Sequence, residues 1–303
     1  MIQSNIKSAR IGYASAILCA VLVGSISTAS KPVLANTNPL MYGALVYLLA
    51  ALASVPLSYK AKGLQVRIRD WPLILAITAS GAIVAPILFF TGLEQTTASD
   101  TAILSNSETI FTVLFALVFF KEKLRPRGYL AVALVLIGVI VVTTNLQFTD
   151  FLSNLKKEGN LLIIASMALW ALDNNISKIV AHRVDVSRLV QLKGLIGGGI
   201  LFIFAMASKI PIGITSIEIP NLLLVGMIGF GISLYLFLHS LKRIGTVRTM
   251  LIYSTGTVFG LFFAVTFLHE AIGLYQILAI ALMLTGIYLV TKESHSVEKI
   301  HQD

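Results

Sequence analysis

The sequence is poor in cysteine and in charge. Its 303 residues include a single cysteine, Cys19, and only 12% of them are Asp, Glu, Lys or Arg. One cysteine excludes an intrachain disulfide and a cysteine-based metal site within one chain. Soluble domains contain about 25% charged residues, so this shortage of charge argues against a water-soluble globule. The zinc motif HExxH and the nucleophile motif GxSxG are also absent. The three consecutive glycines at 197–199 do not match the motif of a phosphate-binding loop.

Long apolar runs take up nearly the whole chain instead. Hydrophobic residues make up 56% of it, and the mean hydropathy is +0.87. A membrane-spanning helix needs about 20 consecutive apolar residues. Runs of about that length lie near 11–30, 39–58, 72–92, 98–120, 128–145, 160–180, 186–207, 221–241, 246–268 and 274–291. The sequence therefore predicts an all-α membrane protein of ten transmembrane helices, with no room for a soluble domain.

The basic residues are distributed unevenly between alternate loops. The net charge is +9, with 23 Lys and Arg. If the N-terminus is cytoplasmic, only Lys31, Lys156, Lys157 and Lys209 fall in loops on the far side. Lys and Arg collect in the loops that stay in the cytoplasm. This pattern predicts a multi-pass protein of the cell membrane with both termini cytoplasmic, and it explains the positive charge without a nucleic-acid partner.

The second half of the chain repeats the first. At one constant offset, Glu122 aligns with Glu270 and Gly138 aligns with Gly286. An offset shorter by one residue aligns Gly12 with Gly159, and Ser30 and Lys31 with Ser177 and Lys178. Because each copy contains five helices, an odd number, the second copy must enter the membrane from the opposite face. Inverted repeats of this kind are typical of secondary transporters.

Several short motifs resemble a known family, the EamA-like drug/metabolite transporters. The residues that carry the resemblance are 105–112 (SNSETIFT), 119–124 (FFKEKL), 136–140 (LIGVI), 267–270 (FLHE) and 284–287 (LTGI). The resemblance implies two inverted five-helix repeats (5+5), over 1–147 and 159–292, and a cytoplasmic tail over 293–303. It also implies a central cavity that often serves export of amino acids or other metabolites. Many members have a proline in the middle of helices 4 and 9. This chain has none there, which leaves open whether these helices bend.

Two predicted helices carry polar stripes at repeat-related positions. The fourth run has its stripe at Thr101, Ser105, Glu108, Thr109 and Thr112, and the ninth run at Thr249, Tyr253, Gly256, Thr257 and Gly260. Such spacings place the side chains on one helical face. Inverted-repeat transporters bind their solute near the midplane, between the repeats. We therefore expect Ser105, Glu108, Thr109, Thr112, Tyr253 and Thr257 to contact the substrate.

Glu108 is the strongest single candidate. An acid at mid-membrane depth costs roughly 2.5–3.5 kcal/mol, so we do not expect it to face lipid. It could exchange a proton or cation, or bind a substrate ammonium group. The alternative is a protonated acid that is hydrogen-bonded to a neighbouring helix for structural reasons.

The sixth and eighth runs add further candidates. Trp170, Asp173 and Asn174 share a face of the sixth run, together with Ser166 and Ser177. We expect these three residues to contact the substrate, and Asp173 could also carry protons. A structural Asp173–Lys193 pair is the alternative, because the two residues lie at similar depth on antiparallel neighbours. His239 is a third proton-coupling candidate, with a structural role near the headgroups as its alternative.

These features favour a carrier over other classes of protein. We expect a secondary active transporter, an exporter of amino acids or other small metabolites, that works by alternating access and is coupled to protons through Glu108. The alternatives are an intramembrane lipid-handling enzyme or a channel. No cofactor, metal site, catalytic residue or obligate protein partner is expected; the partners are the solute and the membrane lipid. We expect the repeated acids Glu122 and Glu270 to stabilise the N-terminus of the helix that follows each of them.

Overall fold

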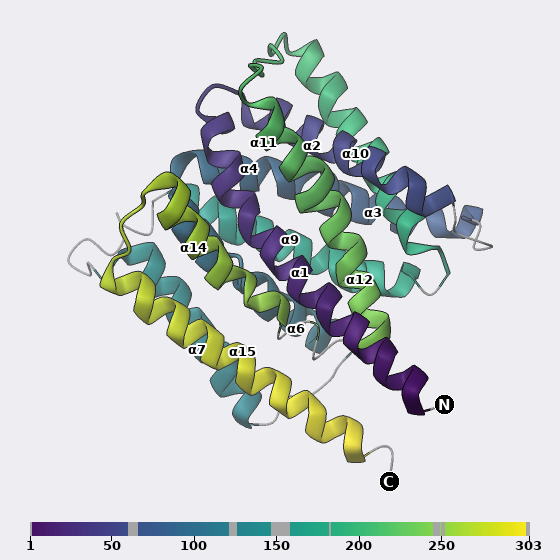
Figure 1. The fold of residues 1–303 in the computed structure, drawn as a ribbon, viewed down its shortest axis with the longest axis vertical. Coiled ribbons are helices and arrows are strands. Elements are labelled where there is room, and N and C mark those ends of the chain that lie inside the picture. Colours follow the sequence, from purple (N-terminus) through teal and green to yellow (C-terminus); the bar gives the residue numbers. More distant parts are fainter. Residues whose placement is uncertain are drawn as a thin grey trace.

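The computed structural model describes residues 2–59, 66–120, 126–146, 158–181, 183–244, 249 and 252–300. These residues form ten successive helical rods, some of them interrupted (Figure 1). The ten-helix all-α fold predicted from hydropathy is therefore confirmed. Lipid offers no partner for backbone N–H and C=O groups, so a helix, which bonds these groups internally, is the structure that such apolar runs adopt.

The first five rods come from the first half of the chain. They are α1 (Ile2–Leu34); α2 (Pro39–Tyr59); a third rod of η1 (Ile68–Asp70), α3 (Trp71–Thr78), η2 (Ala79–Val84) and α4 (Ala85–Gln95); a fourth of α5 (Ala98–Leu104) and α6 (Ser107–Phe120); and α7 (Pro126–Thr144).

The last five rods repeat this order. They are α9 (Glu158–Ala181); α10 (Val186–Ala207); an eighth rod of α11 (Ile219–Leu223), η3 (Leu224–Ile232) and α12 (Ser233–Ile244); a ninth of α14 (Gly256–Leu268), preceded by helical residues 252–254; and α15 (Leu274–Ile300).

Several rods have the length and composition of membrane spans. Within the described residues, five helices qualify outright: Arg10–Leu34, Pro39–Pro56, Ile68–Gln95, Val186–Ala207 and Ile219–Phe237. Shorter apolar helices cover Pro126–Val142, Ile252–Leu268 and Leu274–Gly286. The protein therefore crosses the membrane several times.

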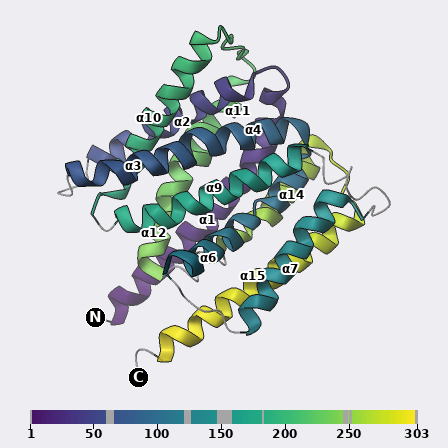
Figure 2. The same ribbon diagram turned by 180° about the vertical axis from the view of Figure 1, so that it is seen from behind.

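The two repeats run in opposite senses. Lys31, near the end of α1, donates hydrogen bonds to the carbonyls of Leu93, Glu94 and Thr96. Thr96 also donates to Asn160, near the start of α9. The first repeat therefore begins at the end of the bundle where the second repeat finishes, and both termini lie there (Figures 1 and 2). We call the opposite end of the bundle, which contains Lys31, Thr96 and Asn160, the distal end.

The packing of the helices follows the repeat. α2 packs along α10, and α7 packs along α15, each with its own counterpart from the other repeat. The α7–α15 pair forms one margin of the bundle (Figure 2). α1 packs against α12 and α14, and its counterpart α9 packs against α4 and α6. The fourth and ninth rods meet directly, through α5 and α14.

The fourth and ninth rods are interrupted without a proline. The fourth rod breaks at Ser105–Asn106, and the ninth breaks at Thr255, at nearly repeat-related positions. Hydroxyl groups stabilise both breaks: Ser107 Oγ donates to Leu104 O over 2.6 Å, and Thr255 Oγ1 donates to Ile252 O over 2.6 Å. Ser and Thr side chains can bond back to the preceding turn and bend a helix. These bonds answer the question that the missing prolines left open.

The third and eighth rods contain π-helical segments at matching places. η2 includes Gly81, and η3 includes Gly229, which aligns with Gly81 at the repeat offset. A Cβ at Gly81 would collide with the Asp173 side chain, and one at Gly229 would lie 2.9 Å from Ile26 Cγ1. Ile26 is the repeat counterpart of Asp173. Both rods therefore pack closely, in the same way, against a helix of the opposite repeat. Single-turn π segments occur often at functional sites.

Candidate functional site

Glu108 lies at the interface between the two repeats. It is in the first turn of α6, directly after the break in the fourth rod. Its Oε1 accepts a hydrogen bond of 2.6 Å from Asn174 Nδ2 of α9. An acid in the first turn of a helix is stabilised by the partial positive charge of the helix N-terminus. The break therefore places a carboxyl group next to a helix N-terminus, in contact with an amide from the other repeat.

A buried ion pair lies one residue away. Asp173, which precedes Asn174 on α9, pairs with Lys193 of α10, and the two side chains are only 7% and 12% exposed. Ser177 Oγ also donates to Asp173 Oδ1 over 3.0 Å. The structure thus contains the pair that was the structural alternative for Asp173. Pairing lowers the cost of burying both charges, and breaking such a pair destabilises strongly.

Trp170 connects the π segment to an aromatic cluster. Its Nε1 donates to Gly81 O over 2.9 Å, and Tyr47 OH donates to the same carbonyl over 2.6 Å. The Trp170 ring lies 5.1 Å from that of Phe89 and 6.1 Å from that of Phe230. Polar ring atoms therefore satisfy a carbonyl within the π segment while the rings fill the space around it. Trp170, which is half-buried, thus bonds to the third rod through its nitrogen and packs against neighbouring rings.

Glu108 and its neighbours contain more carboxyl groups than ammonium groups. Glu108 and Asp173 contribute two carboxyl groups, and Lys193 contributes one ammonium group. Tyr253 of the ninth rod and Cys19 of α1 lie within electrostatic range of Glu108. The region therefore joins side chains from the first, fourth, sixth, seventh and ninth rods, and we call Glu108, Asp173, Asn174 and Lys193 the acidic cluster. Its chemistry suits a proton or a positively charged group.

Three other predicted site residues, Thr112, Tyr253 and Thr257, make contacts between rods. Thr112 O accepts from Asn175 Nδ2 over 3.1 Å, and Tyr253 packs its ring against Phe237 at 5.1 Å. Thr257 is buried between helices, where its hydroxyl donates to Ala102 O over 3.1 Å. Thr257 thus serves the contact between α5 and α14 in this conformation.

The last three predicted site residues make local contacts. Ser105 Oγ donates within its own helix, to Thr101 O over 2.8 Å. Thr109 is 7% exposed, and its N–H donates to Asn106 O over 3.2 Å across the break. His239 stacks on Tyr235 with ring centroids 5.7 Å apart. The structure therefore brings Glu108, Asp173 and Asn174 together and gives Ser105, Thr109 and His239 contacts along their own rods.

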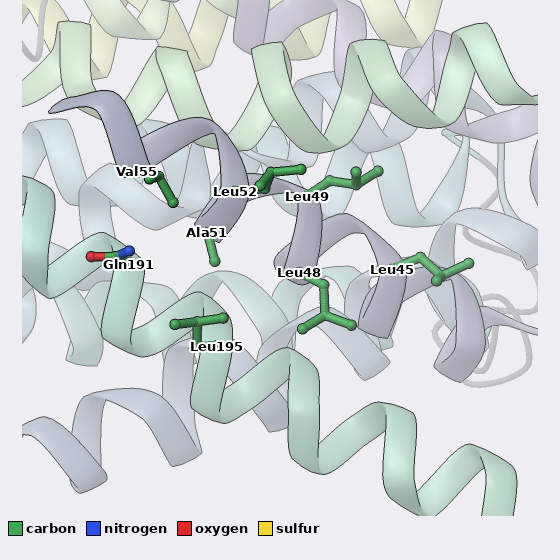
Figure 3. Close-up of a pocket in the computed structure, with 8 residues that line it drawn as sticks. All are labelled: Leu45, Leu48, Leu49, Ala51, Leu52, Val55, Gln191 and Leu195. Atoms are coloured by element: carbon green, nitrogen blue, oxygen red, sulfur yellow. The ribbon is translucent and has the colours of Figure 1, made fainter. Parts of the chain in front are cut away.

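A separate hollow of about 350 Å³ opens between α2 and α10 (Figure 3). Its lining is almost wholly apolar and consists of Leu45, Leu48, Leu49, Ala51, Leu52, Val55, Gln191 and Leu195. This hollow contains none of the predicted site residues. Its surface is of the kind that lipid chains cover.

The sequence did not single out Tyr47 or Gly81. Tyr47 is one aromatic residue within an apolar helix, and nothing in its spacing signals a hydrogen bond to the third rod. Gly81 does carry a signal, because it aligns with Gly229 at the repeat offset. A glycine kept in both copies of a repeat suggests a close backbone approach.

The fold defines a class of protein: a multi-pass membrane protein built from two inverted five-helix repeats. The model of the EamA-like transporter family matches residues 10–144 and again residues 157–292, so the chain belongs to that family. The family consists of transporters and not of enzymes.

Relatives and a solved structure agree with this assignment. An uncharacterized transporter of Methanothermobacter thermautotrophicus is 27% identical, over 92% of this chain and 85% of its own length. The uncharacterized transporter YcxC of Bacillus subtilis is 22% identical, over 91% of each chain. One crystal structure superposes with a TM-score of 0.67 at 18% identity, over 94% of this chain and 98% of that chain, and shows the same fold.

Proposed function

We propose that this transporter is a secondary carrier that exports amino acids or other small metabolites by alternating access, coupled to protons. The observation that carries the proposal is the hydrogen bond between Glu108 and Asn174, which joins the two repeats at a half-buried acid. A carboxyl group between two halves that move against each other can bind a proton in one conformation and release it in the other.

The acidic cluster also favours one kind of solute. It has one more carboxyl group than ammonium group, so a solute with a positively charged amino group would balance it. We propose that Glu108, Asp173 and Asn174 contact such a group, with Trp170, Thr112 and Tyr253 nearby. Ser105, Thr109 and Thr257 stay candidates for a conformation in which α5 and α14 separate, and His239 remains a proton-coupling candidate.

The domain limits and the placement in the cell belong to the same proposal. Residues 1–147 and 159–292 would form the two carrier halves, and residues 293–303 a cytoplasmic tail. The asymmetry of Lys and Arg supports a cell-membrane protein with both termini in the cytoplasm.

Counterflow in proteoliposomes tests the proposed carrier function. The vesicles are loaded with one unlabelled amino acid or metabolite at a time and placed in a trace of its labelled form. A carrier gives saturable, transient accumulation of label, whereas a channel only lets the label equilibrate. Saturable exchange of any solute would establish the carrier and name its substrate class. Equilibration without a transient, in protein shown to be folded, would favour the channel.

A further inference from the structure

At the distal end, a carboxylate of the second repeat accepts hydrogen bonds from the start of a helix in the first repeat. Glu270 follows α14, in the second repeat. Its Oε1 accepts from Ala98 N over 2.8 Å, and its Oε2 accepts from Ser99 N over 2.9 Å and from Ser99 Oγ over 2.6 Å. These donors begin α5, in the first repeat. The sequence predicted that Glu270 would serve the helix that follows it, α15, and the structure places it on α5 instead.

The backbone around Glu270 directs it toward α5. α14 ends at Leu268, and the next residue, His269, adopts the left-handed conformation with φ 54°. The next N–H, that of Glu270, donates to Ala264 O over 3.3 Å. This turn folds the chain back over the end of α14, so that the carboxylate reaches the neighbouring rod. At the start of α5, Thr97 Oγ1 accepts from the third N–H of the helix, that of Asp100, over 2.9 Å. The first two N–H groups of α5 thus depend on a residue of the opposite repeat.

Other polar contacts join the repeats at the same end. Gln276 of α15 donates to Asp100 Oδ1 over 2.8 Å, and both residues are buried. Asn36 Nδ2 donates to Glu218 Oε1 over 2.9 Å. This bond, with that from the Thr215 N–H, lowers the pKa of Glu218 below its ordinary value. Carboxylates therefore accept several of the hydrogen bonds that join the repeats at the distal end.

Directly below Glu270, α5 and α14 touch closely. A Cβ at Gly260 would lie 2.6 Å from the Cβ of Ala102, and Thr257 donates to Ala102 O. In this conformation the two helices therefore lie in direct contact below the bonds that Glu270 makes to the start of α5. Unlike an apolar contact, the carboxylate and the two N–H groups can be hydrated when they part, so the contact can break and re-form at modest cost.

We propose that Glu270 is a latch that holds the distal end shut and must release α5 for this end to open during transport. The inference rests on the proposed alternating-access function and adds a positioning residue to it. Glu270 acts on the access path and does not touch the solute. Its repeat counterpart, Glu122, lies outside the described residues, and the proposal is confined to Glu270.

Thiol accessibility tests the latch without any knowledge of the solute. Thr101, one turn below the latched N–H groups, is 0% exposed. It is replaced by cysteine in a Cys19→Ser background, and the purified protein in lipid nanodiscs is treated with a membrane-impermeant maleimide. Because losing hydrogen bonds to a charged group shifts an equilibrium by about tenfold, Glu270→Ala should raise the labelling rate about tenfold. Glu270→Gln, which keeps the shape but loses the charge, should give a smaller rise.

Glu94→Gln is the matched control. Glu94 is an exposed acid at the same end, and its side chain makes none of the latch contacts. It should leave labelling at the parental rate. The proposal is overturned if Glu270→Ala, with a parental melting temperature, labels at the parental rate. If Glu270→Ala does not fold, the same criterion applies to Glu270→Gln. Failure of counterflow would instead count against the proposed carrier function, since labelling requires no solute.

Discussion

At the scale of single residues, Glu108 is the group whose chemistry matters most. Glu108→Gln keeps the size of the side chain and an oxygen that can accept from Asn174, but it cannot release a proton. We expect this variant to fold and to lose solute accumulation driven by a pH gradient. The expected loss is about 5–150-fold, the change that corresponds to a typical coupling free energy between two bound ligands. The measurement compares gradient-driven uptake with counterflow in the same vesicles.

Glu158→Gln provides the comparison for this variant. Glu158 is an exposed acid in the first turn of α9, the helix that also carries Asn174. Its replacement should leave both fluxes unchanged. Parental pH dependence and substrate kinetics in Glu108→Gln would show that Glu108 is a structural acid and remove it from the coupling mechanism.

The Asp173–Lys193 pair makes a separate prediction about stability. Removing one partner leaves a buried charge without compensation, which typically costs about 3–5 kcal/mol. We expect Asp173→Asn and Lys193→Gln each to lower the melting temperature in detergent markedly. The double variant should lose much less than the sum of the two, because it buries no unpaired charge. Strictly additive losses would mean that the two side chains do not depend on each other.

At the scale of helices, the sequence predicted where each rod lies but not where the rods are interrupted. Hydropathy located every rod because lipid requires each apolar run to bond its own backbone. The sequence left open whether the fourth and ninth rods break, because the breaks at Ser105–Asn106 and Thr255 depend on which carbonyl each hydroxyl group selects. The π segments were missed for a similar reason: an inserted residue in a helical turn leaves no periodic signal in so apolar a stretch.

The π segment of the third rod should be sensitive to added volume. A Cβ at Gly81 would collide with the Asp173 side chain, including its Cβ, which cannot swing away. We expect Gly81→Ala to destabilise the protein by about 1–3 kcal/mol, as overpacking usually does. Gly199→Ala is the control, because a Cβ there would meet no atom within 4 Å. Alanine at 199 should be neutral or stabilise by up to about 1 kcal/mol.

Thermal unfolding of the two alanine variants in the same detergent decides this point. A melting temperature for Gly81→Ala at or above that of Gly199→Ala would contradict the close contact between η2 and α9. Since Gly229 occupies the matching place in η3, Gly229→Ala should behave like Gly81→Ala, with Ile26 as the obstructing residue.

At the scale of the whole molecule, the repeat carried most of the sequence-based argument. It divided the ten predicted helices into two copies of five, an odd number, and the position of both termini at one end of the bundle agrees with two such copies (Figure 1). The similar depth of Asp173 and Lys193 on antiparallel neighbouring helices also suggested the ion pair that the structure contains. The partner of Glu270 could not be found in this way. A carboxylate in a loop can reach any helix start nearby, and the three-dimensional packing of α5 on α14 selects among them.

The charge asymmetry makes the last prediction, which concerns orientation. The sequence assigns most of the Lys and Arg to loops on the same side as the termini, and such loops stay in the cytoplasm. We therefore expect Ser216, an exposed residue in the distal connection between α10 and α11, to face the outside. In a Cys19→Ser background, Ser216→Cys should react with an impermeant maleimide on intact cells. A cysteine at the C-terminal residue, Asp303, should react only after the cells are permeabilised. The reverse pattern would place the latch of Glu270 on the cytoplasmic side and would reverse the direction in which each conformation opens.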